Sequence, residues 1–286
     1  MPQFLRSLLT GSAFLVFFLT GGMVGRLLLP LVANFPGSPE RKRRRRAIFL
    51  LWANRWFVGY MRLLGLVRFK RPPLPADFPH DRPFVMISNH PSLIDALLPL
   101  TMIPGITTVF KPTWYRSWLI RPLLQYGHHI AGPDPKALKA GDDGDDGDAS
   151  ESPVLDRMVD HLRAGHALFI FPEGSRSHER RLRRFRRGAV EAAIRAGVPI
   201  VPIFISVNPP MLMKHQPWYE VPRKGGHYKV EFFPVIPTAG QDLDARAVNR
   251  QLRARYEERH AEMLRERDLD APPVPALPRA STNTSN

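Results

Sequence analysis

Residues 84–95 read FVMISNHPSLID, and residues 166–177 read HALFIFPEGSRS. Each stretch begins as a short apolar run and ends in polar residues, which is the pattern of a buried strand that leads into a turn. In the first stretch Pro91 can open a helix, because proline suits the first helical position. We therefore expect two buried strands, each of which presents polar residues where it ends.

Similar apolar runs elsewhere alternate with segments of helical spacing. Residues 106–110, 200–206 and 228–233 are predicted to be strands, and residues 153–164 and 188–196 are predicted to be helices. Strands that alternate with helices are typical of α/β domains. The sequence thus predicts an α/β fold with a mixed or mostly parallel sheet flanked by helices, preceded by a helical segment that anchors the chain to a membrane.

Composition divides the 286 residues into three expected parts. Residues 1–70 are predicted to form a membrane anchor and an interfacial helix, and residues 71–270 a globular domain that begins with a proline-rich linker. Residues 271–286 contain mainly small, polar and proline residues and are predicted to be a disordered tail. The Gly/Asp run at residues 141–148 is interpreted as a solvated loop.

The N-terminal region is apolar and is followed by a block of positive charge. No charged residue occurs in residues 7–25, a length that comes close to the ~30 Å hydrocarbon core of a bilayer. A second apolar run with Pro30 precedes the basic block at residues 41–46. Such a block marks the cytoplasmic side and attracts anionic headgroups. A single span, a hairpin-like monotopic anchor and a cleaved signal peptide all remain open on this pattern.

A second membrane element is predicted at residues 47–69. Apolar residues recur there at helical spacing, and arginines alternate with Trp52, Trp56 and Tyr60. Basic residues beside aromatic side chains suit a helix that lies in the headgroup layer. The alternative is an ordinary amphipathic helix packed on the core. The anchor before it favours the interfacial interpretation.

The chain is strongly basic and lacks cysteine. Its formal net charge is +15 and its sequence pI is about 10.8, a balance that attracts polyanions. A nucleic-acid-binding protein is one possible class, but no recognisable module is present and the basic runs adjoin apolar segments, so no nucleic-acid partner is expected. The absence of Cys excludes thiolate catalysis, disulfides and Cys-based zinc sites. We expect no metal and no cofactor.

The first motif pairs a histidine with a carboxylate. Asp95 follows His90 by five residues, a spacing that would place the two on different faces of a continuous helix. If His90 instead lies in the turn before the helix, its ring can reach Asp95. The carboxylate would then fix the tautomer, and the other ring nitrogen could act as a general base. A helix-capping turn with a solvent-facing Asp95 is the alternative.

The second motif combines a carboxylate, a glycine and a guanidinium. Glu173, Gly174 and Arg176 follow an apolar strand, and ligands of open α/β sheets bind at the carboxyl ends of the strands. Gly174 would let backbone N–H groups approach an anion, and Arg176 can grip phosphate or carboxylate with two N–H groups. A plain loop with a surface arginine is the alternative.

The paired motifs resemble those of the lysophospholipid (1-acylglycerol-3-phosphate) acyltransferases. NHPSLID at residues 89–95 is similar to the family's Asn-His-x-Ser-x-x-Asp signature, and FPEGSRS at residues 171–177 to its Phe-Pro-Glu-Gly-Thr-Arg-Ser block, with Ser175 in place of threonine. FRRG at residues 185–188 and VPIVP at residues 198–202 resemble two later blocks. Order and spacing agree across about residues 84–206.

The resemblance implies a role for each motif residue. His90 would be the general base and Asp95 the residue that orients it. The acceptor headgroup would be bound by Glu173, Gly174, Ser175 and Arg176, and residues 198–202 would line the acyl-binding side.

The resemblance also implies a reaction. The chain would be an O-acyltransferase that moves a fatty acyl group from acyl-CoA or acyl-carrier protein to a lysophospholipid hydroxyl, without an acyl-enzyme. Its partners would be membrane lipids and the acyl donor. The protein would be located at the cytoplasmic face of a bacterial inner membrane. A non-catalytic lipid-binding protein on the same fold, and an enzyme that acylates a non-glycerophospholipid acceptor, are the alternatives.

One departure from the family pattern concerns the acceptor. The family's second block usually supplies an arginine for the acceptor phosphate, but Pro133 stands in its place and only Lys111 remains at the start of that block. Binding of an anionic headgroup would then fall mainly on Arg176, so lysophosphatidic acid is predicted to be either a weak acceptor or not the physiological one. The arginine-rich residues 179–187 are either a solvated face or a docking site for anionic lipid or an acidic carrier protein.

Overall fold

The computed structural model describes residues 3–133, 152–214 and 216–270, so the predicted loop at 141–148 and tail at 271–286 lie outside the described residues. A seven-stranded sheet forms the centre of the molecule, with strand order β1-β7-β6-β2-β5-β3-β4. Neighbouring strands are parallel except β6 and β7, which are antiparallel. The strands are β1 (Val67–Phe69), β2 (Val85–Ser88), β3 (Thr107–Phe110), β4 (Ile130–Ala131), β5 (Leu168–Ile170), β6 (Ile200–Asn208) and β7 (Gly226–Phe232).

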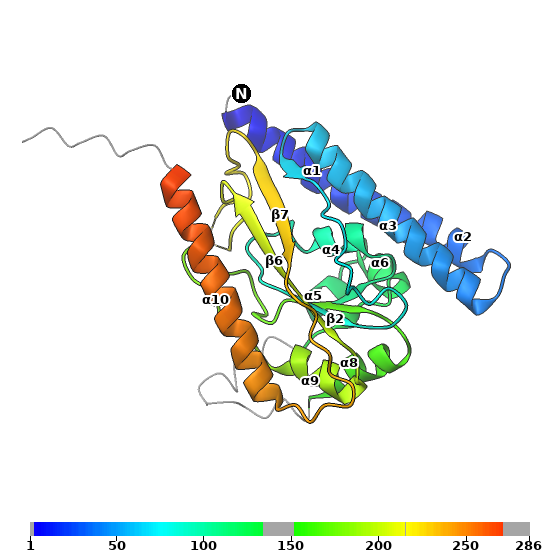
Figure 1. Ribbon diagram of the computed structural model, residues 1–286. Coiled ribbons are helices and arrows are strands. Elements are labelled where there is room, and N and C mark those ends of the chain that lie inside the picture. The colour runs from blue at the N-terminus through cyan, green and yellow to red at the C-terminus, as the bar shows by residue number, and fades with distance from the viewer. Residues whose placement is uncertain (1–2, 134–151, 215, 271–286) are drawn as a thin grey trace, which may run out of the picture.

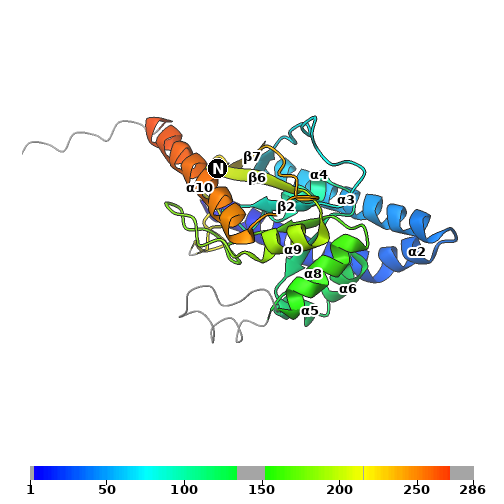
Figure 2. The same ribbon diagram turned by 60° about the horizontal axis from the view of Figure 1, so that its bottom comes forward.

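Helices cover both faces of this sheet (Figures 1 and 2). The N-terminal helices and α4 contribute to one buried cluster, and α8, α9 and α10 contribute to the other. The helical segments are α1 (Gln3–Met23), η1 (Val24–Leu28), α2 (Leu29–Asn34), α3 (Pro39–Leu63), α4 (Leu97–Met102), α5 (Pro112–Tyr115), α6 (Arg121–Tyr126), α8 (Pro153–Arg163), α9 (Gly188–Ala196) and α10 (Ala245–Asp270). This arrangement confirms the predicted α/β fold with a mostly parallel sheet flanked by helices.

The central strand β2 is apolar on both sides because both faces of the sheet are buried around it. In β2, Met86 belongs to the cluster under the N-terminal helices, whereas Val85 and Ile87 belong to the cluster under α8 and α9. Successive side chains of a strand point to opposite faces, so a central parallel strand needs a continuous apolar run. All five predicted strands and both predicted helices are present, with boundaries shifted by up to two residues.

The segment at residues 47–69 differs from its prediction. Helix α3 begins at Pro39, includes the basic block, and ends at Leu63, while residues 67–69 form the edge strand β1 paired with β7. A sheet strand therefore falls within the residues predicted to be anchor. The helix buries Leu51, Phe57 and Met61 and exposes Trp52 and Trp56. It is thus both a core helix and a helix with an exposed aromatic face.

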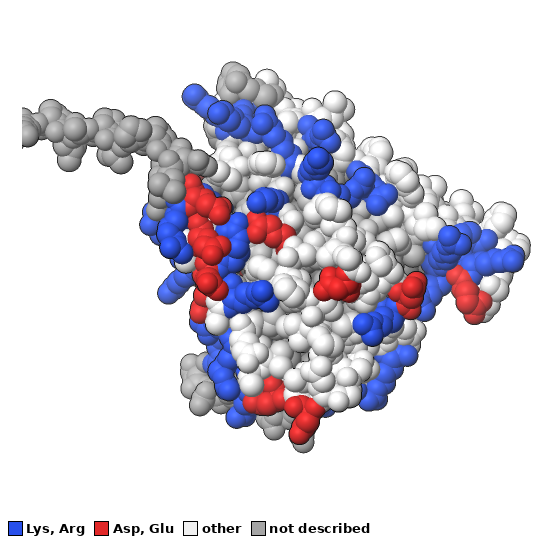
Figure 3. Space-filling view, viewed as in Figure 1, with Lys and Arg blue, Asp and Glu red and all other residues white. Residues whose placement is uncertain are grey.

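The N-terminal apolar segment forms a continuous helix of changing pitch. The described chain has one helix long and apolar enough to cross a membrane, Gln3–Asn34, and 22% of its apolar window is buried. A π-helical turn, η1, separates α1 from α2. Gly22 and Gly25 allow close approach to neighbouring segments, since a Cβ on Gly25 would lie 2.9 Å from the backbone nitrogen of Leu123. Lys and Arg gather at the start of α3, next to α2 (Figure 3).

Four histidines pack together between β3, β4 and α8. The rings of His161 and His166 are 4.4 Å apart, and those of His128 and His166 are 5.7 Å apart. His129 Nδ1 accepts a hydrogen bond of 3.0 Å from the backbone N–H of Thr108. Burial, then the neighbouring positive charges, lowers the pKa of His129 to about 3 and the pKa values of His161 and His166 to about 4.

These histidines should make the fold sensitive to acid. A histidine whose pKa is lower in the folded state contributes stability above its unfolded pKa of about 6.5, and this stability is lost as the pH falls towards about 4. We expect the Tm in detergent to fall over this window, and His166→Asn to flatten the fall. The exposed His80→Asn is the matched control. A Tm that depends equally on pH in wild type and His166→Asn would refute this assignment.

Candidate active site

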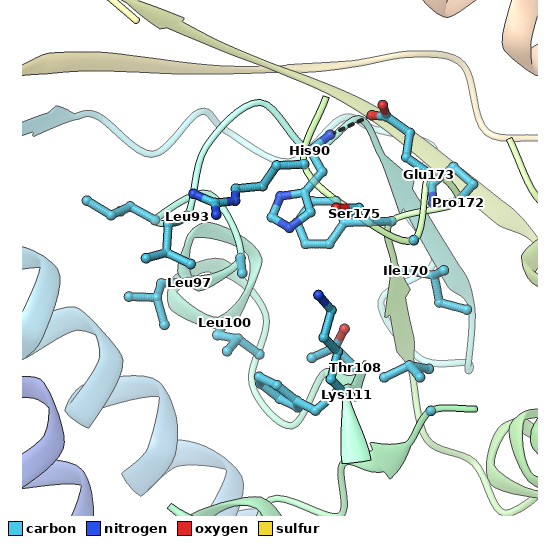
Figure 4. Close-up of a pocket in the computed structure, with 18 of the residues that line it drawn as sticks. His90, Leu93, Leu97, Leu100, Thr108, Lys111, Ile170, Pro172, Glu173 and Ser175 are labelled. Carbon is cyan, nitrogen blue, oxygen red and sulfur yellow. Dashed lines mark hydrogen bonds between the residues drawn. The ribbon is translucent and has the colours of Figure 1, made fainter. Parts of the chain in front are cut away.

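The two sequence motifs meet because their strands are neighbours. β2 and β5 pair in parallel with Ile87 opposite Ile170, so the segments that follow the two strands leave the sheet at the same edge. Beyond that edge the backbone N–H of His90 donates to Glu173 Oε1 at 3.0 Å (Figure 4). The backbone N–H of Ser177 donates to the carbonyl of His90 at 2.7 Å. The structure thus brings together two motifs that lie more than 80 residues apart.

His90 and Asp95 form the predicted pair. His90 Nδ1 lies 2.9 Å from Asp95 Oδ1 and 3.1 Å from Oδ2. The Asp95 side chain is fully buried, whereas that of His90 is 16% exposed and lines a cavity. Residues 91–96 are non-helical, which is why a spacing of five residues can place both side chains together. The capping alternative with a solvent-facing Asp95 is therefore wrong.

A second layer of contacts holds the carboxylate and the imidazole in place. The backbone N–H of Ser92 donates to Asp95 Oδ2 at 2.9 Å, and Ser92 Oγ is 2.7 Å from the hydroxyl of Tyr228. Burial raises the pKa of Tyr228, so this hydroxyl stays protonated. The ring of His90 stacks on Phe171 at a centroid distance of 3.8 Å. The imidazole is consequently clamped by a carboxylate on one edge and an aromatic ring on one face.

The end of β2 is fixed by side chains that extend the sheet's hydrogen bonding. Asn89 Nδ2 donates to the carbonyl of Ile205 at 2.8 Å, and its Oδ1 accepts from the Ile205 N–H at 2.7 Å. The Tyr256 hydroxyl, from α10, reaches the carbonyls of Ile87 and Ile203 at 2.7 and 2.9 Å. These bonds tie β2 to β6 immediately before His90, so the backbone that carries the histidine is held in a fixed position.

Glu173 is engaged entirely by the protein. Its Oε1 accepts from the His90 N–H and from Ser177 Oγ at 2.6 Å, and its Oε2 accepts from the Arg183 N–H at 2.8 Å. Burial raises the pKa of Glu173, and these hydrogen bonds oppose that effect. Its contact with the acceptor headgroup stays a prediction, and Glu173 does line the cavity. The carboxylate also ties together both motifs and the arginine-rich segment.

The rest of the second motif faces the cavity. Gly174, with φ of 64°, adopts the left-handed conformation that favours glycine, and a Cβ there would meet Arg186 Nε at 3.4 Å. Ser175 lies beside His90 (Figure 4) and also lines the cavity. Arg176 Nη1 donates to the carbonyls of Leu212 and Met213, at 2.7 and 3.1 Å.

The cavity joins an apolar arm to a basic rim. Its volume is about 1840 Å³. The apolar arm extends from His90 to the N-terminal helices and α4, and its lining includes Phe14, Phe17, Leu50, Phe57, Leu97 and Leu100. The basic rim includes Lys111, Arg176, Arg183, Arg186 and Lys214. Such a space suits a molecule with a long apolar chain and an anionic end.

Two sequence expectations need correction here. Residues 198–202 do not line the cavity, because Ile200 pairs with Val85 at the opposite end of β2 from His90. The basic residues 179–187 are more than a solvated face, since Arg183 and Arg186 line the cavity. Pro133 is on the cavity wall, which agrees with the position predicted for the absent arginine.

Sequence reasoning missed Tyr228 and Lys214. Tyr228 supports Ser92 from β7, and Lys214 lines the cavity from a loop that follows β6. Neither belongs to a motif. The apolar alternation of β7 predicted a strand, but no local pattern indicates which of its inward side chains reaches residue 92.

The arrangement can perform general-base chemistry. Nδ1 of His90 is occupied by Asp95, which leaves Nε2 for a proton on a bound molecule. In Figure 4 His90 and Lys111 approach the same space from opposite sides. A hydroxyl bound there would lie between a base and a positive charge, at the junction of the apolar arm and the basic rim.

Known proteins share this motif-bearing region. The model of the Acyltransferase family matches residues 74–206. A chloroplastic 1-acyl-sn-glycerol-3-phosphate acyltransferase of Arabidopsis thaliana is 32% identical over 61% of this chain and 44% of its own length. The human 1-acyl-sn-glycerol-3-phosphate acyltransferase alpha is 30% identical over 58% of this chain and 54% of its own. The chain thus spans about half the length of these relatives.

A solved structure shares the fold over nearly the whole chain. The crystal structure of the 1-acyl-sn-glycerophosphate acyltransferase PlsC from Thermotoga maritima superposes with a TM-score of 0.68 at 18% identity, covering 91% of this chain and 95% of that one. The family match over residues 74–206 includes both motifs and the strands that carry them, β2 and β5. Residues 74–206 therefore match the Acyltransferase family, and the chain is similar to the 1-acyl-sn-glycerol-3-phosphate acyltransferases.

Proposed function

We propose that this protein transfers a fatty acyl group from an acyl thioester, acyl-CoA or acyl-carrier protein, to the free hydroxyl of 1-acylglycerol 3-phosphate. The observation that carries the proposal is the placement of His90, oriented by Asp95, where the apolar arm of the cavity meets its basic rim. Acyl chains fit the arm and a phosphate fits the rim. The relatives named for this reaction support the choice of acceptor.

The proposed mechanism requires no acyl-enzyme. Nε2 of His90 takes the proton of the acceptor hydroxyl as its oxygen attacks the thioester carbonyl carbon. The negative charge of Asp95 stabilises the imidazolium that forms. Collapse of the tetrahedral intermediate breaks the C–S bond, and the leaving thiolate takes the proton back from His90. The chain ends the cycle with His90 again neutral.

A direct assay decides between this function and its alternatives. Purified protein is given oleoyl-CoA or oleoyl-carrier protein with lysophosphatidic acid, a neutral monoacylglycerol or a zwitterionic lysolipid, and products are identified by mass spectrometry. Formation of phosphatidic acid supports the proposal. Preference for another lipid would favour the interpretation of Pro133 made from the sequence. Tight lipid binding without any product would favour the non-catalytic alternative.

We also propose that the protein works at the cytoplasmic face of a bacterial inner membrane. Exposed apolar side chains run along the helix Gln3–Asn34, and the basic residues 41–46 lie at its end, where anionic headgroups would meet them. Residues of α1 also line the cavity, which argues against removal of this segment as a signal peptide. A reporter fused to the C-terminus should behave as cytoplasmic, and a periplasmic signal would overturn this sidedness.

The exposed face of α1 should carry part of the membrane affinity. Leu15 and Leu19 are 59% and 56% exposed, so glutamates there leave the core intact but oppose contact with lipid. We expect Leu15→Glu/Leu19→Glu to weaken partition into anionic vesicles by about ten-fold or more. Gln251→Glu/Ala254→Glu, which adds two carboxylates to exposed positions of α10, is the matched control. Equal partition of both double variants would show that this face does not contact lipid.

A further inference from the structure

The basic rim gathers more positive charge beside His90 than the two motifs supply. The side chains of Lys111, Arg176, Arg183 and Lys214, here called the four-cation group, all line the cavity that contains His90. They come from the end of β3, from the loop after β5, and from the loop after β6. These four side chains are therefore brought to one cavity by the tertiary structure.

Arg176 fixes the loop that carries Lys214. Its Nη1 donates to the carbonyls of Leu212 and Met213, the two residues directly before Lys214. Leu212 is buried and has a φ of 52°, a left-handed conformation that is uncommon for a residue with a branched side chain. The loop thus holds an unfavourable backbone conformation at the point where Arg176 binds it. Backbone conformations of this kind often occur at functional sites.

Arg183 is placed by the same carboxylate that positions His90. The Arg183 N–H donates to Glu173 Oε2 at 2.8 Å, and Glu173 Oε1 accepts from the His90 N–H. The positive charges of the four-cation group also interact electrostatically with one another. The pKa of Lys214 is lowered by partial desolvation and then by the positive charges of Arg183, Lys111 and Arg176.

Within the described residues these cations form no ion pair with a carboxylate, although the charge of Asp95 opposes the lowering of the Arg176 pKa by burial. Among the described residues that line the cavity, only Glu173 and Glu257 are acidic. Both oxygens of Glu173 accept hydrogen bonds, and Glu257 pairs with Arg253 at 2.8 Å. Unpaired cations held together at a cavity are the mark of a site for a multiply charged anion.

We propose that Lys214 and Arg183 complete, with Lys111 and Arg176, a site for the phosphomonoester of the lipid acceptor, and so replace the arginine that is absent at residue 133. The inference rests on the proposed function and adds the residues that select the headgroup. A phosphomonoester carries close to two negative charges at pH 7 and three acceptor oxygens, which suits donors that converge from several segments. Lys214 is then a determinant of specificity that lies outside both motifs.

The test separates the acceptor's phosphate from the phosphates of the donor. With lysophosphatidic acid and oleoyl-CoA, we expect Lys214→Ala to raise the KM for the acceptor about ten-fold and to change kcat and the KM for oleoyl-CoA little, as loss of one charge-assisted hydrogen bond predicts. Lys214→Arg should restore most of the affinity. Turnover of monoacylglycerol, which lacks the phosphate, should be unaffected. The exposed Lys224→Ala is the matched control.

A measurement without turnover keeps the inference distinct from the proposed function. Inorganic phosphate and sn-glycerol 3-phosphate should raise the Tm of the wild-type protein in detergent, and raise that of Lys214→Ala less. A rise in the KM for oleoyl-CoA alone, an equal loss with monoacylglycerol, or equal protection of both proteins by phosphate would overturn the inference. Failure of the wild-type protein to acylate lysophosphatidic acid would instead overturn the proposed function, while phosphate protection would still report on the site.

Discussion

His90→Ala should lower kcat for acyl transfer by about 10²- to 10⁴-fold, the usual contribution of a general base. The KM values should change little, because the apolar arm and the basic rim remain. His90→Asn is the sharper variant, since its Nδ2 takes the position of Nδ1 and can still donate to Asp95, but its amide cannot accept and return a proton at neutral pH. We expect it to be as inactive as His90→Ala and closer to wild type in Tm.

Initial rates of phosphatidic acid formation measure this effect. The exposed His80→Ala should retain full activity, which excludes a general response to the loss of a histidine. Comparable turnover by purified His90→Asn and wild type would remove His90 from the mechanism and with it the proposed general base.

Asp95→Asn should also be severe, with an expected loss of about 10²- to 10⁴-fold in kcat. The side chain is fully buried, and its carboxylate accepts from His90 Nδ1 and from the Ser92 N–H. Asparagine keeps the shape but removes the charge that stabilises the imidazolium, and its NH₂ group can turn towards Nδ1 and favour the wrong tautomer. Substrate binding should be retained because Asp95 does not line the cavity.

Two control variants show whether the loss of activity in Asp95→Asn is specific to the Asp95 carboxylate. Ser92→Ala keeps the backbone N–H that binds Asp95 and should cost far less, although it loses the contact with Tyr228. The surface variant Asp81→Asn should be fully active. If Asp95→Asn turned over at the wild-type rate with its Tm preserved, orientation of His90 by a carboxylate would have no part in catalysis.

Local sequence patterns determined the elements and the catalytic pair. Apolar runs identified β2, β3, β5 and β6, because a strand buried on both faces has no polar side, and alternation of apolar and polar residues identified β7. Strands β1 and β4 escaped notice, since two or three residues at an edge carry too little periodic signal. The N–H–P–S–L–I–D spacing sufficed for His90 and Asp95 because the turn between them involves only neighbouring residues.

The long-range features were decided by the tertiary structure. Strand order puts β5 beside β2, so that Glu173 forms a hydrogen bond between the two motif segments, which the sequence did not predict. The register places Ile200 opposite Val85, at the end of β2 away from His90, and residues 198–202 do not line the cavity although their motif suggested a role in binding. A motif records which residues occur together along the chain, but not the end of the sheet at which each will lie.

The sequence by itself determined the α/β class, the apolar N-terminal segment, the His90–Asp95 pair and the absence of an arginine at residue 133. Only the tertiary structure joined Lys111, Arg176, Arg183 and Lys214 at one cavity and extended that cavity to the N-terminal helices. The physical reason is the separation along the chain over which each kind of interaction acts. Periodicity and turn chemistry act over a few residues, whereas the meeting of charges from distant loops depends on strand crossovers and on hydrogen bonds such as that from Arg176 to the carbonyl of Met213.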